Sequence, residues 1–356
     1  MQQPILPPIP RCRPSPRHGR IRLLYHLAVL ILVVPHGLSA ENTLQLPTAN
    51  HALFETGAED KFFVGTTGKP WTTGTFGCVR TEGRQMHEGL DIRCIKRDKR
   101  GEPKDPIMAT AEGEVAYIND KSPLSNYGKY IVLRHQVDEL EIYSIYAHLS
   151  VIAPEMKPGR PVKAGEVIGI MGRTTNTRES ISKERAHVHF ELNLLVNDRF
   201  PAWYKKTFPD QRNDHGAWNG QNLVAIDPRE ILLAQRNQGA KFNLAAYLRN
   251  QTALCRVLVR DTNFPWLKRY PQLLHPNSVA DQEGVAGYEI ALNYNGVPFG
   301  LTPRAASEIK GKSGVQLLTV NDAEERKHPC RRLVAKRGSR WELTAAGRNL
   351  MSLLVF

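Results

Sequence analysis

The stretch Ala186-His187-Val188-His189-Phe190-Glu191-Leu192 restricts the possible folds of this chain more than any other part of its sequence. Side chains of an extended strand alternate between two faces, so His187 and His189 project from one face while Val188 and Phe190 project from the other. The alternation predicts a strand that buries an apolar face and presents two imidazoles together. A lone histidine is usually an ordinary polar residue, so a ligand role for this pair requires further ligands nearby.

Such ligands occur about a hundred residues upstream, in His87-Glu88-Gly89-Leu90-Asp91. His87 and Asp91 are four residues apart, so they share a face if the segment is a strand, and they also converge if the chain turns at Gly89. Two imidazoles and one carboxylate form a ligand set that catalytic zinc uses, with the fourth position left for water. The two motifs together predict a metal site on a sheet.

The chain between these motifs is a series of short strands separated by turn signals. Apolar and β-branched residues dominate the runs 113–118 and 129–135, and the run 140–148 alternates in polarity. No apolar repeat with the 3.6-residue period of a helix persists in this region. We therefore expect a mainly β fold with a sheet at its core.

Three motifs follow one another along these strands: His87-x-x-x-Asp91, Tyr146-Ala147-His148-Leu149 and His187-x-His189. Together with the runs 127–132 and 163–169, they make the region from Phe76 to Leu192 resemble the lysostaphin/LytM-type zinc endopeptidases, which cleave peptide bonds in bacterial peptidoglycan. The resemblance covers about a third of the chain. It implies a peptidase domain over residues 75–200, built as an antiparallel β-sheet or β-sandwich.

The resemblance also implies roles for five side chains. His87, Asp91 and His189 would bind one zinc ion per chain, and His148 and His187 would be the catalytic histidines beside it. The substrates would be the stem or cross-bridge peptides of peptidoglycan. Zinc activates a water molecule, and an imidazole with a pKa near neutrality can take or give the proton. No H-E-x-x-H motif is present, so a glutamate base on a helix is not expected.

One segment departs from the pattern of that family. The loop from Thr174 to Ala186 is longer and more charged than the small Ser/Thr/Gly-Pro run that usually precedes the final His-x-His. Two alternative functions stay open: a non-catalytic, wall-binding regulator of other wall hydrolases, and a zinc peptidase that acts on proteins. The intact set of five side chains favours an enzyme over a regulator. We expect Glu88 and Glu191 to be solvated charges, with a hydrogen bond to a ligand histidine as the alternative for either of them.

The first forty residues have the features of a secretion signal. They contain five arginines and no acidic residue, a short apolar run from Leu23 to Val34, and the small-residue cleavage site Leu38-Ser39-Ala40. The apolar run is too short to span a bilayer, and no later stretch is long and apolar enough. We expect an exported protein, periplasmic or extracellular, with no transmembrane segment in the mature chain.

The formal net charge of +13 is concentrated in two parts of the chain. Residues 41–240 hold 26 basic and 26 acidic residues, whereas residues 241–356 hold 17 basic and 9 acidic ones. The basic residues of the last third could bind anionic wall polymers or could be an ordinary solvated surface. They include Lys310, Lys312, Arg326, Lys327, Arg331, Arg332, Lys336, Arg337 and Arg340. Export and the lack of a base-stacking motif argue against nucleic-acid binding.

Four of the five cysteines follow the leader, which contains Cys12. An even number of cysteines in an exported protein predicts disulfides. Three pairings are possible, and proximity in sequence favours Cys78–Cys94 and Cys255–Cys330. The first of these would close a loop around His87 and Asp91.

The remaining segments divide the chain further. Residues 41–74 are a lead-in to the peptidase domain, and residues 201–245 are a connection that contains a short helix, with Asp227 as its N-cap and Pro228 at its first position. A second helix is expected from Leu244 to Asn250. Residues 246–356 have the pattern of a separate β-rich (α+β) module of unknown role. Its expected strands are 256–259, 287–294, 315–320, 332–335, 340–343 and 350–356.

Overall fold

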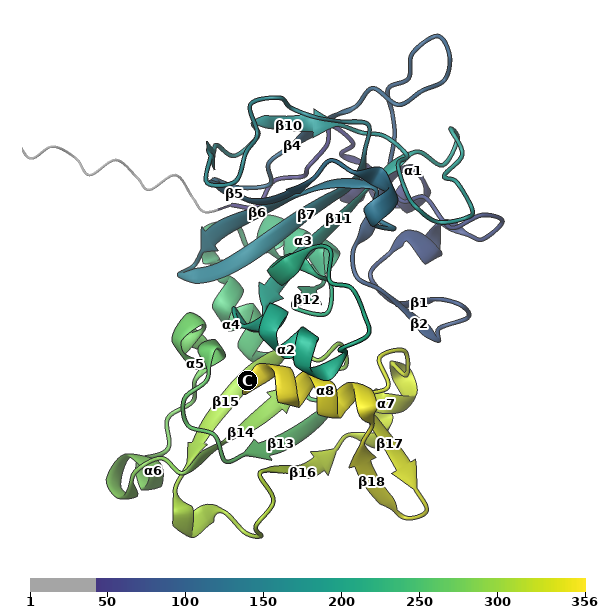
Figure 1. Cartoon of the computed structure of the whole chain (residues 1–356). Coiled ribbons are helices and arrows are strands. Elements are labelled where there is room, and N and C mark those ends of the chain that lie inside the picture. Colours follow the sequence, from purple (N-terminus) through teal and green to yellow (C-terminus); the bar gives the residue numbers. More distant parts are fainter. Residues whose placement is uncertain (1–42) are drawn as a thin grey trace, which may run out of the picture. The chain divides into compact units, whose positions relative to one another are not determined.

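The strand that carries the His-x-His pair lies inside the largest sheet. In the computed structural model, which describes residues 43–356, this strand is β11, His187–Leu195, and all of its residues are buried. It belongs to a seven-stranded antiparallel sheet with the order β12-β11-β7-β6-β5-β9, in which β3 also pairs with β11 (Figure 1). The expected secretion signal and Cys12 lie outside the described residues.

The strands of this sheet confirm the expected β runs between the two histidine motifs. They are β3 (Leu90–Arg93), β5 (Gly113–Asn119), β6 (Lys129–Val137), β7 (Leu140–Leu149), β9 (Pro161–Val162), β11 and β12 (Leu223–Ile226). Two smaller antiparallel sheets consist of β1 (Gly77–Arg80) with β2 (Gln85–His87), and of β4 (Pro106–Met108), β10 (Val167–Ile170) and β8 (Val151–Ile152).

The two faces of the large sheet are both covered, but by different sets of residues. Val188, Phe190 and Leu192 of β11 belong to the main apolar core, together with Tyr146 of β7. Ala147 of β7 belongs to a second, smaller apolar cluster on the opposite face. The apolar and polar positions of β11 therefore alternate as expected, and the histidines share the face of the smaller cluster.

The last third of the chain is also mainly β. Its strands are β13 (Cys255–Val259), β14 (Gly287–Leu292), β15 (Pro298–Arg304) and β16 (Val315–Val320), in the antiparallel order β15-β14-β13-β16, and the hairpin of β17 (Val334–Arg337) and β18 (Arg340–Leu343). The mainly β fold class is confirmed. Strand β15 had no counterpart in the sequence-based prediction, since Pro298 and Pro303 lie within it.

Helices are few and short. They are α1 (Glu59–Phe62), α2 (Phe200–Thr207), α3 (Pro228–Gln238), α4 (Leu244–Arg249), α5 (Pro265–Arg269), α6 (Ser278–Glu283), α7 (Asp322–Lys327) and α8 (Ala345–Leu354). The two expected helices are confirmed as α3 and α4. The carboxylate of Asp227 caps α3 by accepting hydrogen bonds from the backbone N–H of Arg229 at 2.9 Å and of Glu230 at 3.3 Å. No helix within residues 43–356 combines the length and the apolar character needed to cross a membrane.

The strand expected at 350–356 is wrong, because most of this segment is helix α8. The hydroxyl of Thr344 caps the helix by accepting a hydrogen bond from the N–H of Gly347 at 3.2 Å. Gly347, Met351 and Leu354 are buried at the four- and three-residue spacing of one helix face. The apolar run at the end of the chain concealed this spacing.

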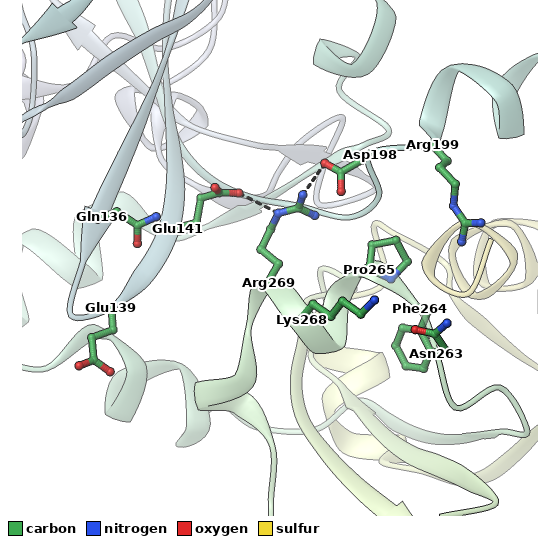
Figure 2. Close-up of a pocket in the computed structure, with 10 residues that line it drawn as sticks. All are labelled: Gln136, Glu139, Glu141, Asp198, Arg199, Asn263, Phe264, Pro265, Lys268 and Arg269. Carbon is green, nitrogen blue, oxygen red and sulfur yellow. Dashed lines mark hydrogen bonds and ion pairs between the residues drawn. The ribbon is translucent and has the colours of Figure 1, made fainter. Parts of the chain in front are cut away.

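The C-terminal third contacts the large sheet through polar groups as well as apolar ones, and residues 43–356 all lie within one compact unit. Arg269 of α5 donates to Glu141 of β7 at 2.7 Å and also forms an ion pair with Asp198 (Figure 2). The side chain of Asn197 donates to the carbonyl of Leu353 in α8 at 2.8 Å. The boundary at residue 246 stays a prediction.

The two expected disulfides are wrong. The structure pairs Cys78 with Cys330, whose Cα atoms are 5.4 Å apart although 252 residues separate them in sequence. Cys94 and Cys255 are free and buried. The thiol of Cys94 donates to Asp105 at 2.9 Å. Proximity in sequence misled the prediction because Cys78 lies in β1, where the fold brings the C-terminal third against the β1–β2 hairpin.

We predict that peptide mapping under non-reducing conditions will recover a Cys78–Cys330 peptide. Burial raises the pKa of the Cys94 thiol and of the Cys255 thiol to about 12 each, so both stay protonated and resist alkylation at pH ~8 until the protein unfolds. Cys330→Ser should lower the free energy of unfolding by about 2–5 kcal/mol. Recovery of Cys78–Cys94 and Cys255–Cys330 peptides would contradict the structure.

Candidate metal centre

Strand register brings the three expected metal ligands together. His189 of β11 is directly opposite Asp91 of β3 on one side and Ala147 of β7 on the other. Directly opposite residues of antiparallel strands project from the same face, with Cβ atoms about 4.5–5.5 Å apart. The ring of His87, at the end of β2, reaches the same point after the chain turns through Gly89. A Cβ atom at Gly89 would lie 2.4 Å from the carbonyl oxygen of Phe190, so this close approach requires glycine.

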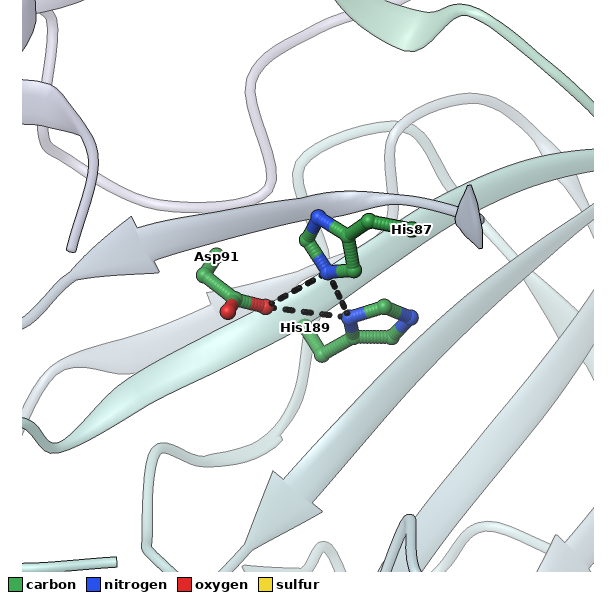
Figure 3. A group of neighbouring side chains, drawn as sticks. All are labelled: His87, Asp91 and His189. Atoms are coloured by element: carbon green, nitrogen blue, oxygen red, sulfur yellow. Dashed lines mark hydrogen bonds and ion pairs between the residues drawn. The ribbon is translucent and has the colours of Figure 1, made fainter. Parts of the chain in front are cut away.

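The three side chains form a compact set of donor atoms (Figure 3). His87 Nε2 lies 3.1 Å from Asp91 Oδ1 and 3.1 Å from His189 Nδ1, and His189 Nδ1 lies 3.0 Å from Asp91 Oδ1. All three side chains are buried. Two imidazole nitrogens and one carboxylate oxygen converging on one point fit a zinc ion, which takes such ligands at about 2.0–2.2 Å.

The outer hydrogen bonds of the two ligand histidines orient their lone pairs. His87 Nδ1 lies 2.7 Å from the carbonyl oxygen of Thr75, and His189 Nε2 lies 2.7 Å from Glu191 Oε1. Because both oxygens only accept hydrogen bonds, the outer nitrogen of each ring carries a proton. The inner nitrogen of each neutral ring then directs a lone pair at the site, as a metal ligand must.

Two further histidines, His148 and His187, lie beside this group. Their ring centroids are 4.8 Å apart, and that of His148 is 6.1 Å from that of His189. His187 Nε2 lies 3.5 Å from Asp91 Oδ1. The Nδ1 of His148 donates to the carbonyl oxygen of Thr174 at 2.8 Å, and that of His187 donates to the carbonyl oxygen of Arg185 at 2.7 Å. Each neutral ring therefore has an unprotonated Nε2.

The backbone of His148 is unusual. Alternation along β7 places Tyr146 in the main core and Ala147 on the site face, so a regular strand would turn His148 towards the core. His148 instead has a φ of +62°, in the left-handed region. Such a conformation costs a non-glycine residue about 1–3 kcal/mol and is often found at functional sites. The change of backbone direction brings the fourth histidine to the site.

Burial and mutual repulsion make the two additional histidines weak bases. Burial lowers the pKa of His148 well below its usual value, and repulsion between its protonated form and protonated His187 or His189 lowers it further. Burial also lowers the pKa of His187, although the Asp91 carboxylate opposes this effect. Both rings are therefore neutral at pH ~7 in the metal-free protein.

For the ligands Asp91 and His189, in contrast, the surroundings favour the charged form of the side chain. Burial raises the pKa of Asp91, but His187 and His87 together with hydrogen bonds outweigh this effect and hold it well below the usual range. Burial lowers the pKa of His189, but hydrogen bonds to Asp91 and Glu191 outweigh it and raise the pKa to about 10. Without a metal, a proton on His189 stabilises the cluster of carboxylates, and a metal cation would replace that proton.

The prediction that Glu191 is a solvated charge is wrong. Three residues that support the site were not predicted from the sequence: Tyr127, Asn193 and Arg80. Glu191 is only 2% exposed and binds His189, Asn193 Nδ2 at 2.9 Å and the hydroxyl of Tyr127, so it is not a solvated charge. Glu191 is two residues after His189, so both side chains project from the same face of the strand. This spacing is the feature of the sequence that could have placed Glu191 beside the metal ligands. Arg80 Nη2 donates to Asp91 Oδ2 at 2.6 Å. Glu88 is 35% exposed and pairs with Arg331 at 3.4 Å, outside the metal ligands.

The five expected side chains all line one cleft of about 460 Å³. The charged loop between Thr174 and Ala186 forms part of its wall through Thr175, Thr177, Arg178 and Glu179. The loop that departs from the family pattern therefore lies where it can affect the choice of substrate.

Comparisons with known proteins identify the same region. Residues 85–199 match the model of Peptidase family M23. The cell division protein DipM of Caulobacter vibrioides is 29% identical over 108 residues, which are 30% of this chain but only 14% of that protein. The present chain thus matches only a small part of its curated relative.

Solved structures with similar regions include a zinc-containing peptidase from Vibrio cholerae, which is 27% identical, with coverage of 30% of this chain and 26% of that chain and a TM-score of 0.23. The catalytic domain of the antimicrobial peptidase lysostaphin from Staphylococcus simulans is 21% identical, with coverage of 45% and 87% and a TM-score of 0.28. Since both TM-scores are low, the assignment depends on the family match and on the site residues. The match to the M23 family model spans residues 85–199, the part of the chain that contains all five expected site residues.

Proposed function

We propose that this protein is an exported zinc metalloendopeptidase that hydrolyses the peptide cross-links of bacterial peptidoglycan. One observation carries the proposal: His87, Asp91 and His189 direct three donor atoms at one point, and two neutral imidazoles stand beside it. A buried cluster of this kind has little structural value, because buried ionisable groups cost stability unless they are paired. A catalytic metal accounts for the whole arrangement.

The residues of the chain would divide the reaction between them. When bound, zinc supplies Lewis-acid chemistry and activates water for attack on a peptide carbonyl. The free Nε2 of His148 or of His187 accepts the proton of the attacking water, and the resulting imidazolium can return it to the leaving amine. Before it returns this proton, the imidazolium can donate a hydrogen bond to the developing oxyanion.

The substrate and the location are parts of the same proposal. The match of residues 85–199 to the M23 family model supports peptide-bond hydrolysis, and the leader with five arginines in residues 1–40 supports export. Binding of anionic wall polymers by the basic C-terminal residues stays a prediction. Some of these residues already have acidic partners, as Arg326 does in Asp322 and Arg337 in Glu342, which reduces the charge available for a polymer.

We predict about one zinc ion per chain and release of peptides from purified sacculi. Chelation and His189→Ala should each abolish release, since either change removes the metal. Mass spectrometry of the digest and metal analysis of the protein provide the measurements. His51→Ala is the matched control. His51 is exposed, and its side chain makes no hydrogen bond to the short 3-10 helix Ala52–Phe54 that follows it. Peptide release by the metal-free protein would refute the proposal.

Asparagine substitution separates the catalytic histidines from the ligands. His148→Asn and His187→Asn should keep the zinc and lower the kcat for peptide release by about 10²–10⁴-fold, the usual contribution of a general acid or base. Zinc content and thermal unfolding should match those of the wild-type protein. Wall binding by the zinc-loaded wild-type protein without any peptide release would instead favour a non-catalytic regulator.

Glu191→Gln tests the orientation of His189. The glutamine has the same shape but lacks the charge that holds the Nε2 proton, so zinc affinity should fall about 10–100-fold. Competition with a chromophoric chelator measures the affinity. Glu88→Gln, at the neighbouring carboxylate on the rim, serves as the control and should leave the affinity close to that of the wild-type protein. An unchanged affinity in Glu191→Gln would exclude a role for Glu191 in the metal site.

A further inference from the structure

Three arginines line the same cleft as the metal ligands, and one of them, Arg178, lies in the charged loop. Arg80 lies at the end of β1, and Arg185 lies two residues before His187. Both are held by the segment before β1. Arg80 Nε donates to the carbonyl oxygen of Thr73 at 2.6 Å. Arg185 Nε donates to the carbonyl oxygen of Gly65 at 3.0 Å, and its Nη1 donates to the hydroxyl of Thr67 at 3.0 Å. These contacts fix both side chains in the cleft wall.

The two arginines differ in how their charges are balanced. Arg80 forms an ion pair of 2.6 Å with Asp91, whose other oxygen faces the metal site. Arg185 is half-buried and, among residues 43–356, has no carboxylate within ion-pair distance. Its hydrogen-bond partners are a carbonyl and a hydroxyl oxygen, and the carboxylates of Asp91 and Glu179 act on its charge only from beyond ion-pair distance. A partly desolvated cation is stabilised when an anion binds to it.

Arg185 is also close to the reacting groups. Its carbonyl oxygen accepts the hydrogen bond of His187 Nδ1 at 2.7 Å, so its backbone orients one of the two proposed catalytic histidines. Arg185 lies in the turn before β11, and it lines the cleft together with His187 and His189 of that strand. An anion bound by the guanidinium would therefore lie beside the bond to be cleaved.

We infer that Arg185 selects peptide substrates that carry a free carboxylate next to the scissile bond. Two of the five N–H groups of the guanidinium are used by Gly65 and Thr67, so three remain for a ligand. Charge-assisted hydrogen bonds from arginine to a carboxylate are roughly twice as strong as neutral ones. The carboxylate can be an acidic side chain or the end of a peptide chain. This inference rests on the proposed peptidase function and adds the chemical class of the substrate.

Matched synthetic peptides test the inference. Each cross-linked peptide is made with its side-chain carboxyl free or amidated and, separately, with its terminal carboxyl free or amidated. The zinc-loaded full chain should cleave one of the two free acids with a kcat/KM about 10–100-fold above that of the matching amide. The pair that shows this difference identifies the source of the carboxylate. Equal kcat/KM values within both pairs would overturn the inference.

Arg185→Gln removes the charge but keeps an amide that can donate to Gly65. The variant should lose the preference for the acid, so that the ratio of its kcat/KM values for acid and amide falls to about one. Arg134→Gln is the control, because Arg134 is a surface arginine that pairs with Glu114 at 2.8 Å and does not line the cleft. Thermal unfolding and zinc content verify the fold of both variants. A preference that persists in Arg185→Gln would contradict the assignment.

A binding experiment distinguishes failure of the proposed peptidase function from failure of carboxylate recognition by Arg185. If the wild-type protein cleaves no peptide, affinities of the same acid and amide peptides for the zinc-loaded protein are measured by fluorescence anisotropy. Tighter binding of the acid that is lost in Arg185→Gln supports carboxylate recognition without catalysis. Equal affinities for acid and amide overturn it.

Discussion

Antiparallel pairing of β11 with β3 on one side and with β7 on the other is the constraint on which the site is built. This pairing places His189 between Asp91 and Ala147 and so brings together residues that are about a hundred positions apart in sequence. A shift of one residue in either pairing would turn the histidines of β11 towards the main core, because strand side chains alternate with a period of two. Val188 and Phe190 in that core prevent such a shift.

Hydrogen bonds to the outer atoms make this buried cluster of ionisable groups tolerable. Every histidine of the site has one ring nitrogen bound to a backbone carbonyl or a carboxylate, and Arg80 occupies the second oxygen of Asp91. Unpaired, these groups would each cost several kcal/mol on burial. The partners also fix which nitrogen of His87 and of His189 faces outward, so the inner nitrogen of each ring is the one left for a metal. The same hydrogen bonds thus provide stability and preorganisation.

The C-terminal third is tied to the part of the chain that carries a ligand. Cys78 lies opposite Met86 in the β1–β2 hairpin, next to the His87 position, and its disulfide to Cys330 anchors that hairpin covalently. Arg331, the next residue, pairs with Glu88 beside the same ligand. The hairpin has only two strands, and a two-stranded hairpin is marginally stable by itself. A covalent link at this place restricts the position of His87 in a way that a short hairpin cannot.

The sequence by itself determined the main strands of the large sheet, the shared face of His187 and His189, and the five side chains of the candidate site, because these depend on local alternation and on an ordered set of motifs. It also contained the position of Glu191 on that face. Only the tertiary structure decided which cysteines pair, that the chain ends in helix α8, and that the left-handed backbone of His148 turns its ring to the site. The same holds for Arg185, whose guanidinium is held in the cleft wall by Gly65 and Thr67, more than a hundred residues away in sequence. These features depend on contacts between distant segments and on one exceptional backbone angle, and periodicity along the chain reports neither.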